Sequence, residues 1–413
     1  MFPGRKVLAS VVATAAVAAT VAGCGGSSAG PAASGGSQSP LTRTVTIGVL
    51  VDVTGPAAAG NKSAVNGVKA GVRYASRNGY TVKYVLADTQ TSPATALTAA
   101  QKLVTQDHVT AVFAQSALTF AAAPYLAAHN IPVIGGSGDG TEWATTPTMF
   151  PVLGAIHQNK VASTLGQFFK ARGVTTVGTI GYNLPQSAVA TKSAAESAKA
   201  AGLKVGYVNA QFPLGGTDVG PATIAMKAAG VDGVTASTAA NTSFALITGL
   251  REQGVALKAA LLPVGYGGDL LAAGPGATGA AQDVYFSTAY EPVEMQTAAT
   301  KQFAADLSAT GTTGSPTYAA YNGYASIGLL VRGLTDAGGT PSSATLITAL
   351  SEVHDWNALG LLGTHRVDIN DRENIVAGAD NCLWITQFKG STFQLVAGAD
   401  PICGTVLKGV TVS

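Results

Sequence analysis

Charged residues are scarce in this 413-residue sequence: Asp, Glu, Lys and Arg together make up 11% of it, whereas about 25% is typical of soluble domains. The 24 basic and 22 acidic residues nearly balance, which leaves a formal net charge of +2. No basic stripe is visible, and this argues against a nucleic acid as partner. A surface with so little charge steers charged molecules weakly, so a highly charged ligand is not favoured.

Histidine is also rare, and the five histidines form no pair at the helical spacing of metal ligands. The glycine-rich segment 135–140 reads GGSGDG, which matches neither the dinucleotide-binding nor the phosphate-loop pattern. Asp139 also breaks the G-x-S-x-G spacing of serine hydrolases. We therefore expect no metal site and no cofactor. We also expect no enzymatic activity, because no nucleophile–base pair can be named.

The amino-terminal segment has the pattern of a signal peptide. Arg5 and Lys6 precede a run of 16 uncharged, mostly apolar residues over 7–22, which is too short for a comfortable transmembrane helix. The run leads into VAGC, and the small residues before Cys24 resemble a bacterial lipobox, in which that cysteine is diacylated. The alternative is a plain secretory signal with a chance cysteine. We predict a signal peptide over 1–23 and a lipidated, flexible tether over 24–43; no other stretch resembles a membrane span.

The remaining cysteines, Cys382 and Cys403, form an even pair in the oxidising compartment that a signal peptide implies. Two apolar-rich runs, 383–388 and 391–396, flank a Lys-Gly turn between them, and this pattern is typical of a hairpin. A disulfide would close the hairpin 382–403 as a loop of about 20 residues and contribute about 3 kcal/mol on the chain-entropy estimate. Metal binding is the alternative, but two cysteines with no histidine nearby in the sequence make a poor site.

Short apolar runs alternate with helical patterns, and the alternation starts twice. Strand and helix patterns alternate from residue 44 to about 135 and again from 175 to 264, which indicates two parallel sheets covered by helices. The later segments must complete these two lobes, so the chain crosses between them more than once and makes a hinge. We predict an α/β fold of two doubly wound parallel-sheet lobes joined by a multi-crossover hinge. Lobe 1 comprises 44–159 and 286–338, and lobe 2 comprises 160–285 and 339–413.

Several motifs resemble a known family. The opening 47–56, IGVLVDVTGP, is followed by NGVKAG at 66–71, and further matches follow in order at 88–93, 131–134 and 318–324. Over residues 44 to 380 the chain resembles type I periplasmic binding proteins of the leucine/isoleucine/valine-binding class. The resemblance implies two lobes around a cleft, hinge closure on a ligand, and an ABC permease as partner. We expect a monomer that is lipid-anchored to the extracytoplasmic side of the bacterial cell membrane.

The ligand is expected in the cleft, because parallel sheets bind ligands beyond the carboxyl ends of their strands, where helix N-termini point. Loops at such positions supply the candidate ligand-binding residues of both lobes. In the first lobe these are Thr54, Gln115, Ser116, Thr119, Gly138 and Asp139; in the second they are Gln186, Thr238 and Tyr266.

Three of these residues have alternative roles. The Ser116 hydroxyl either contacts a ligand carboxylate, as the resemblance implies, or caps the helix that follows it. Asp139 stands where the family has a hydroxyl residue, and it either pairs with a ligand amine or caps a helix. Tyr266 either contacts the ligand or packs half-buried. It also follows the strand after which related amino-acid-binding proteins often have an acidic residue; that ammonium partner is absent unless Asp139 or Asp269 replaces it.

The resemblance therefore predicts a binding protein for a small amino acid, branched-chain or related, that delivers it to an ABC importer. The missing acidic residue makes a small amide or other small carboxylate the alternative ligand. A tethered sensor that presents its closed form to a membrane receptor would have the same sequence features.

Overall fold

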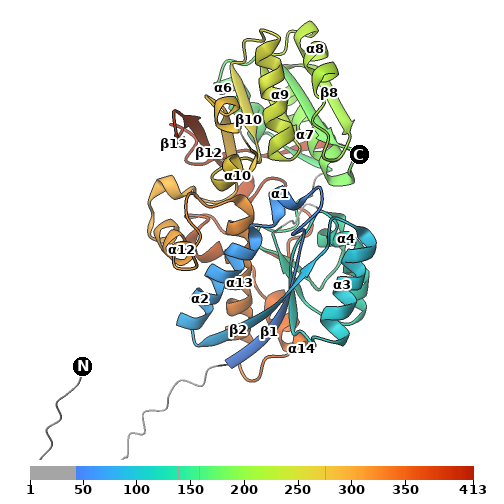
Figure 1. The fold of residues 1–413 in the computed structure, drawn as a ribbon, viewed down its shortest axis with the longest axis vertical. Coiled ribbons are helices and arrows are strands. Elements are labelled where there is room, and N and C mark those ends of the chain that lie inside the picture. Colours follow the sequence, from blue (N-terminus) through green and yellow to red (C-terminus); the bar gives the residue numbers. More distant parts are fainter. Residues whose placement is uncertain (1–42, 137–139, 158, 275) are drawn as a thin grey trace, which may run out of the picture. The chain divides into compact units, whose positions relative to one another are not determined.

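Two large β-sheets organise the chain, as Figure 1 shows for the computed structural model. The structure describes residues 43–136, 140–157, 159–274 and 276–413. The predicted signal peptide, Cys24, nearly all of the tether, Gly138 and Asp139 lie outside the described residues. From residue 43 onward the chain forms one compact unit.

The first sheet has the strand order β2-β1-β3-β4-β5, with all neighbouring strands parallel. Its central strands are apolar and buried on both sides, as a parallel sheet with helices on both faces requires. The strands are β1 (Arg43–Val51), β2 (Tyr80–Asp88), β3 (Ala111–Gln115), β4 (Val133–Gly135) and β5 (Met149–Pro151). The connecting helices are α1 (Ala58–Asn61), α2 (Ala64–Arg77), α3 (Pro93–Thr105), α4 (Thr119–Ala128) and α5 (Thr141–Thr145).

The second sheet has the order β13-β12-β11-β10-β9-β7-β8. Five of its strands are parallel, and β12 and β13 extend it antiparallel at one edge. The parallel strands are β7 (Thr176–Tyr182), β8 (Lys204–Phe212), β9 (Gly233–Ser237), β10 (Ala259–Leu262) and β11 (Tyr285–Thr288). The helices around them are α6 (Thr164–Ala171), α7 (Pro185–Ala200), α8 (Gly220–Ala228), α9 (Ala240–Glu252), α10 (Gly268–Ala272) and α11 (Ala277–Ala280).

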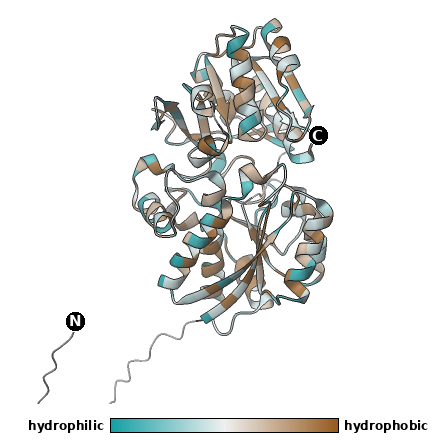
Figure 2. Cartoon of the chain, viewed as in Figure 1, coloured by the Kyte–Doolittle hydropathy of each residue, from teal (hydrophilic) through white to brown (hydrophobic). Residues whose placement is uncertain are grey.

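Helices far along the chain complete the first lobe. They are α12 (Ala298–Ser308), α13 (Tyr318–Ala337) and α14 (Ser343–Ser351). The apolar α13 packs along α2 on one face of the first sheet, while α3 and α4 cover the other face (Figure 1). Hydropathy colouring shows hydrophobic residues along the strands and along α13 (Figure 2). Within the described part of the chain, no helix combines the length and hydropathy that crossing a membrane requires.

The contact between α2 and α13 requires glycine on both helices. A Cβ atom on Gly67 would lie 2.0 Å from the carbonyl oxygen of Ala320, and one on Gly323 would lie 2.3 Å from the carbonyl oxygen of Ala64. The two backbones therefore touch, and no larger residue fits between them. Most residues of the 20-residue helix α13 are buried.

The chain passes between the lobes at three places: after β5, after β11, and before β12. The first crossing contains β6 (Lys160–Ala162), which pairs with β15 (Val406–Thr411) near the end of the chain. The second and third contain the short turns η1 (Val293–Met295), η2 (Ala358–Gly360) and η3 (Ala379–Asn381). The predicted α/β fold of two parallel-sheet lobes with several crossings is confirmed.

Two predicted lobe boundaries differ from the structure. Residues from 339 were assigned to the second lobe, but α14 packs on α13, and the Ser343 hydroxyl donates to the carbonyl oxygen of Thr110 at 2.7 Å. Residues 286–288, assigned to the first lobe, are part of β11 in the second sheet. The first lobe's later segment therefore begins and ends further along the chain than predicted.

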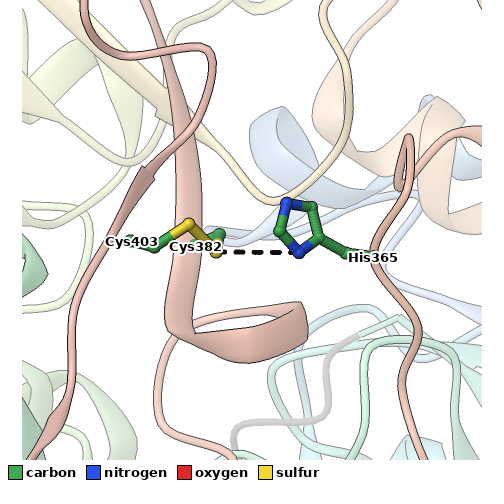
Figure 3. A group of neighbouring side chains, drawn as sticks. All are labelled: His365, Cys382 and Cys403. Carbon is green, nitrogen blue, oxygen red and sulfur yellow. Dashed lines mark hydrogen bonds between the residues drawn. A yellow bond between two sulfur atoms is a disulfide. The ribbon is translucent and has the colours of Figure 1, made fainter.

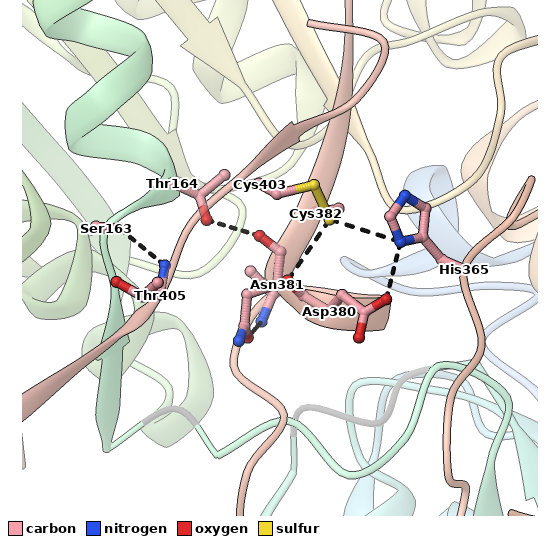
Figure 4. The surroundings of a disulfide bond; sticks show 9 residues. Ser163, Thr164, His365, Asp380, Asn381, Cys382, Cys403 and Thr405 are labelled. Carbon is pink, nitrogen blue, oxygen red and sulfur yellow. Dashed lines mark hydrogen bonds and ion pairs between the residues drawn. A yellow bond between two sulfur atoms is a disulfide. The ribbon is translucent and has the colours of Figure 1, made fainter.

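The predicted hairpin is present at the edge of the second sheet. β12 (Cys382–Lys389) pairs antiparallel with β13 (Thr392–Leu395), and β14 (Ile402–Cys403) pairs with the start of β12. This register places Cys382 directly opposite Cys403, and the two form a disulfide (Figures 3 and 4). The sequence prediction of this disulfide is confirmed.

Candidate ligand-binding site

The carboxylate of Asp52 lies at the centre of a hydrogen-bond network where the strands of the first sheet end. Its Oδ2 accepts from Asn61 Nδ2 at 2.8 Å and from the Ala117 N–H at 2.9 Å. Its Oδ1 accepts from Ser116 Oγ at 2.6 Å and from the Thr89 hydroxyl. Asp52 is fully buried, and a buried carboxylate needs donors of this kind to offset the loss of hydration. The network therefore fixes three loops relative to one another.

The Ser116 hydroxyl is occupied within this network. It donates its proton to Asp52 and accepts from the Leu118 N–H at 3.1 Å, just before α4 begins. Thr119 donates to the Ser116 carbonyl oxygen at 2.8 Å. A hydroxyl has one proton to donate, and the Ser116 proton is donated to Asp52. The N-cap residue of α4 is Leu118, and no side chain caps this helix. Thr119 is fully buried and holds the same turn.

Gln115 continues the network toward the second crossing. Its Nε2 donates to Asn61 Oδ1 at 3.0 Å, and its Oε1 accepts from Asn322 Nδ2 at 3.1 Å. Asn322 Oδ1 in turn accepts from the hydroxyl of Tyr290 at 2.8 Å, and Tyr290 lies just after β11. An unbroken chain of hydrogen bonds thus runs from Asp52 to the segment that leaves the second sheet. Gln115 thus links Asn61 to Asn322.

Thr54 holds a neighbouring loop through Asp88. Its hydroxyl donates to Asp88 Oδ2 at 2.7 Å, and its N–H donates to Asp88 Oδ1 at 3.2 Å. Partial burial alone would raise the pKa of the Asp88 carboxyl, but these bonds and those from the backbone N–H groups of Gln90 and Val53 bring the pKa below its usual value. The carboxylate of Asp88 therefore stays ionised and keeps the Thr54 loop in place.

A cavity of about 610 Å³ opens between the lobes beside the Asp52 network. This volume is within the range of small-molecule sites. First-lobe residues line it from the end of β3 and from α5, and second-lobe residues line it from the start of α7. Its apolar lining consists of Ala117, Phe120, Ala144, Ile156, Pro185, Val189 and Val412; its polar lining includes Ser116, Thr141, Glu142, Thr145, His157, Asn159, Gln186 and Ser413.

Two candidate residues from different lobes meet at this cavity. Gln186, at the start of α7, donates from Nε2 to the carbonyl oxygen of Ala117 at 3.3 Å, directly after Ser116. The hydrogen bond spans the two lobes. Both Gln186 and Ser116 line the cavity. Of the candidates within the described residues, these two are the ones that the structure brings together there.

Thr238 and Tyr266 lie away from the cavity lining. The Thr238 hydroxyl is within 2.9 Å of Ser243 Oγ, at the start of α9. The Tyr266 hydroxyl donates to Glu294 Oε2 at 2.5 Å and accepts from the Val293 N–H at 3.1 Å. Burial raises the pKa of Tyr266 well above its usual value and also raises the pKa of Glu294. These contacts tie the second lobe to η1.

Asp269, named as a replacement for the missing ammonium partner, lies buried in α10. Its carboxyl accepts from the backbone N–H of Tyr318, the first residue of α13, while its Oδ1 has no hydrogen-bond partner in the described structure. Burial raises its pKa to about 7. The side chain therefore joins the second lobe to the start of the first lobe's longest helix.

Most residues that line the cavity were not candidates in the sequence analysis, and Phe120 and His157 are two of them. Phe120 is the second residue of α4, and its side chain stays 45% exposed while lining the cavity. An aromatic residue directly after the loop at the end of a strand could have identified Phe120 as a candidate from the sequence. His157 lines the cavity from the first crossing, and nothing in its local sequence marks it. A second cavity of about 600 Å³ lies within the second lobe, between α8, α9 and α11.

Comparisons with known proteins agree with this architecture. Residues 44–392 match the model of a family described as periplasmic binding protein. No curated protein matches the sequence.

Similar solved structures have the same fold at low identity. The leucine binding protein LivK of Thermotoga maritima is 18% identical, with a TM-score of 0.68 over 86% of this chain and 98% of that one. A solute binding protein of an ABC transporter from R. palustris, solved with 4-hydroxybenzoate, is 18% identical, with a TM-score of 0.70 over 86% and 96%. Another from R. palustris, solved with benzoate, is 16% identical, with a TM-score of 0.70 over 88% and 97%.

Proposed function

Because this chain belongs to the periplasmic binding protein family, we propose that it captures a small solute in the cavity between its lobes and delivers it to an ABC permease. Members of this family bind small molecules outside the cytoplasm and hand them to such permeases. The observation that carries the proposal is the 610 Å³ cavity, which residues of both lobes and of the first crossing line together.

The mechanism follows from the two-lobe arrangement. A solute in the cavity contacts α4 and α5 on one side and the start of α7 on the other, so it makes all its contacts only when the lobes are closed. The solute therefore stabilises the closed form by the contacts that the open form lacks. The hydrogen bond from Gln186 to the Ala117 carbonyl oxygen is one interaction that opening would break.

We propose a small amino acid, branched-chain or related, as the ligand. The mostly apolar lining favours an apolar side chain, and the cavity includes the carboxylate of Glu142, which attracts an ammonium group. The alternative is a small aromatic or other carboxylate, or an amide. Two observations favour this alternative. The Phe120 ring lines the cavity. The Tyr266 hydroxyl is hydrogen-bonded to Glu294 instead of to a ligand. Two similar structures contain benzoate and 4-hydroxybenzoate.

Isothermal titration of the purified protein with leucine, isoleucine, valine, benzoate and 4-hydroxybenzoate distinguishes the two ligand classes. An amino-acid ligand predicts saturable one-to-one binding of one of the first three and none of the aromatic acids. Binding of the aromatic acids alone would establish the alternative. If no compound of a broad amino-acid, amide and carboxylate panel bound, the solute-binding proposal would fail.

We further propose that Cys24 is diacylated and that the 24–43 tether holds the two lobes at the outer face of the cell membrane as a monomer. The C24S variant should appear in the culture medium or the periplasm instead of the membrane fraction, and mass spectrometry of the wild-type amino-terminal peptide should show the lipid. A tethered sensor is the alternative to transport. Loss of solute uptake when the gene is deleted supports transport, and unchanged uptake supports the sensor.

A further inference from the structure

The helix α2 carries positive charge along one face. Residues 53–87 include five basic residues and no acidic one. Three of the basic residues, Lys69, Arg73 and Arg77, lie on α2 at intervals of four, so they share one face of the helix. Lys62 is seven residues before Lys69, and its backbone is also helical, which brings it to the same face. We call these four residues the basic face of α2. They are four to seven residues apart in the sequence, which is why no basic stripe is visible there.

The basic face of α2 is open to solvent and only partly neutralised. Lys62 and Lys69 are exposed. The side chains of Arg73 and Arg77 are 49% and 44% exposed, and both lie within 4.0 Å of the carboxylate of Asp306, which is 3% exposed. Four positive charges and this one negative charge leave a formal net charge of +3 on the face. A surface of this kind attracts an anionic partner.

The proposed tether reaches the described structure beside the basic face. Arg43, the first residue of β1, donates from its N–H to the carbonyl oxygen of Gly79 at 3.2 Å, just after the end of α2. Figure 1 shows the start of β1 at the same end of the first lobe as the carboxyl end of α2. Arg43 is exposed and adds a further positive charge. The membrane that holds the tether therefore lies near this end of the lobe.

The lengths of the tether and of the basic face agree. A glycine- and serine-rich chain of about 20 residues spans about 25 Å on average. The basic face extends over about 22 Å, at 1.5 Å per helical residue. A membrane at the far end of such a tether is within reach of the whole face.

Anionic phospholipids fit this face as partner. Each Lys or Arg near an anionic membrane surface increases partitioning about fivefold, and the attraction fades within about 10 Å at moderate salt. We propose that the basic face of α2 and Arg43 contact the anionic phospholipid headgroups of the membrane that holds the tether. The contact orients the first lobe with α2 along the membrane. Because the tether confines the protein near the surface, a weak contact is sufficient.

The position of the charges, and not the net charge of the chain, carries this inference. The predicted signal peptide contains two of the 24 basic residues, Arg5 and Lys6, and no acidic one. Without it the chain has 24 − 2 = 22 basic and 22 acidic residues. A chain with zero formal net charge has no overall attraction to an anionic surface, so binding to one reports a local patch. The inference does not depend on solute binding, and it uses the tether only to identify the surface.

Sedimentation with phospholipid vesicles tests the contact. The chain over 25–413, prepared without the signal peptide and without Cys24, is mixed at about 0.1 M salt with vesicles of phosphatidylcholine alone or with an equal part of phosphatidylglycerol. We expect binding only to the vesicles that contain phosphatidylglycerol, and loss of that binding at about 0.5 M salt. Absence of binding to the anionic vesicles overturns the proposal.

Reversing two charges of the face should weaken binding. Lys62 and Lys69 are suitable because neither belongs to an ion pair within the described residues. K62E/K69E should bind the anionic vesicles at least tenfold more weakly than the wild type, and K62Q/K69Q should show a smaller loss. Circular dichroism establishes that the variants are folded; if K62E/K69E is unfolded, the loss in K62Q/K69Q decides.

The matched control makes the same change in net charge on the second lobe. Lys204 in β8 and Lys227 in α8 are exposed, and K204E/K227E should bind within about threefold of the wild type, since salt screens distant charges. Equal losses in K62E/K69E and K204E/K227E would overturn the proposal. Release of the bound protein by inorganic phosphate, at the concentration of the lipid phosphate, would also overturn it, because α2 would then bind phosphate ions and not a membrane surface.

Discussion

The Ser116 hydroxyl donates a hydrogen bond to Oδ1 of the buried Asp52 at 2.6 Å, although 64 residues separate the two in the sequence. The hydroxyl that the family resemblance assigns to a ligand is thus used to join the ends of β1 and β3. Ser116 also lines the wall of the cavity. The shape of the site therefore depends on a carboxylate that does not itself line it.

Replacing Asp52 with Ala should destabilise the protein by about 3 to 5 kcal/mol, because the buried hydroxyls of Ser116 and Thr89 lose their acceptor. Urea unfolding followed by circular dichroism measures the change. D336A is the control: Asp336 pairs with Arg332 on the surface, and such pairs contribute less than about 1 kcal/mol. Equal effects of the two substitutions would contradict the role given to Asp52.

Replacing Phe120 with Ala should weaken ligand binding about tenfold or more while leaving the unfolding free energy nearly unchanged. The ring lines the cavity and is already 45% exposed, so its removal costs the ligand more apolar contact than it costs the fold. Isothermal titration with the ligand found in the screen measures the effect. I224A removes a side chain that is 59% exposed on α8 and not part of this cavity; it should bind like the wild type.

Replacing Gly67 with Ala should destabilise the protein by about 3 kcal/mol or more, because the added methyl would meet the backbone of α13 at Ala320. The backbone of a packed helix cannot move away as a flexible side chain can. Gly60 is the matched control, since nothing lies within 4 Å of a Cβ added there, and G60A in the short helix α1 should be neutral or slightly stabilising. Thermal unfolding of both variants tests this, and a neutral G67A would show that the two helices are further apart.

Local patterns were sufficient to predict most of the fold. At the start of α3, Ser92 accepts from the Thr95 N–H at 3.4 Å and Pro93 lies in the first turn, which is a local pattern typical of a helix start. The assignment of α14 to the second lobe was wrong because its local pattern says only that it is a helix. Its packing partner, α13, is set by tertiary contacts, and a sequence pattern does not specify which of two sheets a late segment joins.

The site was predicted less completely than the fold. The loops that follow β3 and β7 were identified, and Ser116 and Gln186 from them line the cavity. The partners that occupy Ser116, Gln115 and Tyr266 come from distant positions: Asp52, Asn322 and Glu294. A motif shows that a polar side chain lies near the end of a strand, but it does not show which polar group forms a hydrogen bond with it.

Asp269 should make stability depend on pH in the direction opposite to most carboxylates. Burial raises its pKa in the folded protein to about 7, above the ordinary 3.8. Between these values the folded state holds the proton and the unfolded state does not, so this group's contribution is full below pH 4 and is lost as the pH rises toward 7. The loss amounts to roughly 4 kcal/mol.

The comparison of wild type with D269N isolates this contribution, because Asn has the same shape and no titration. The difference in unfolding free energy between the two proteins, measured by urea titration at pH 4.5, 5.5, 6.5 and 7.5, should shift steadily in favour of D269N as the pH rises. D218N, at an exposed carboxyl, should give a difference that is flat over the same range.

Asp269 joins α10 to the first residue of α13, so ligand affinity should also fall from pH 5.5 to 7.5 in the wild type. Suppose the wild-type ligand affinity is constant with pH while the stability difference between wild type and D269N changes. The protonation of Asp269 would then affect only folding and not the closure of the lobes.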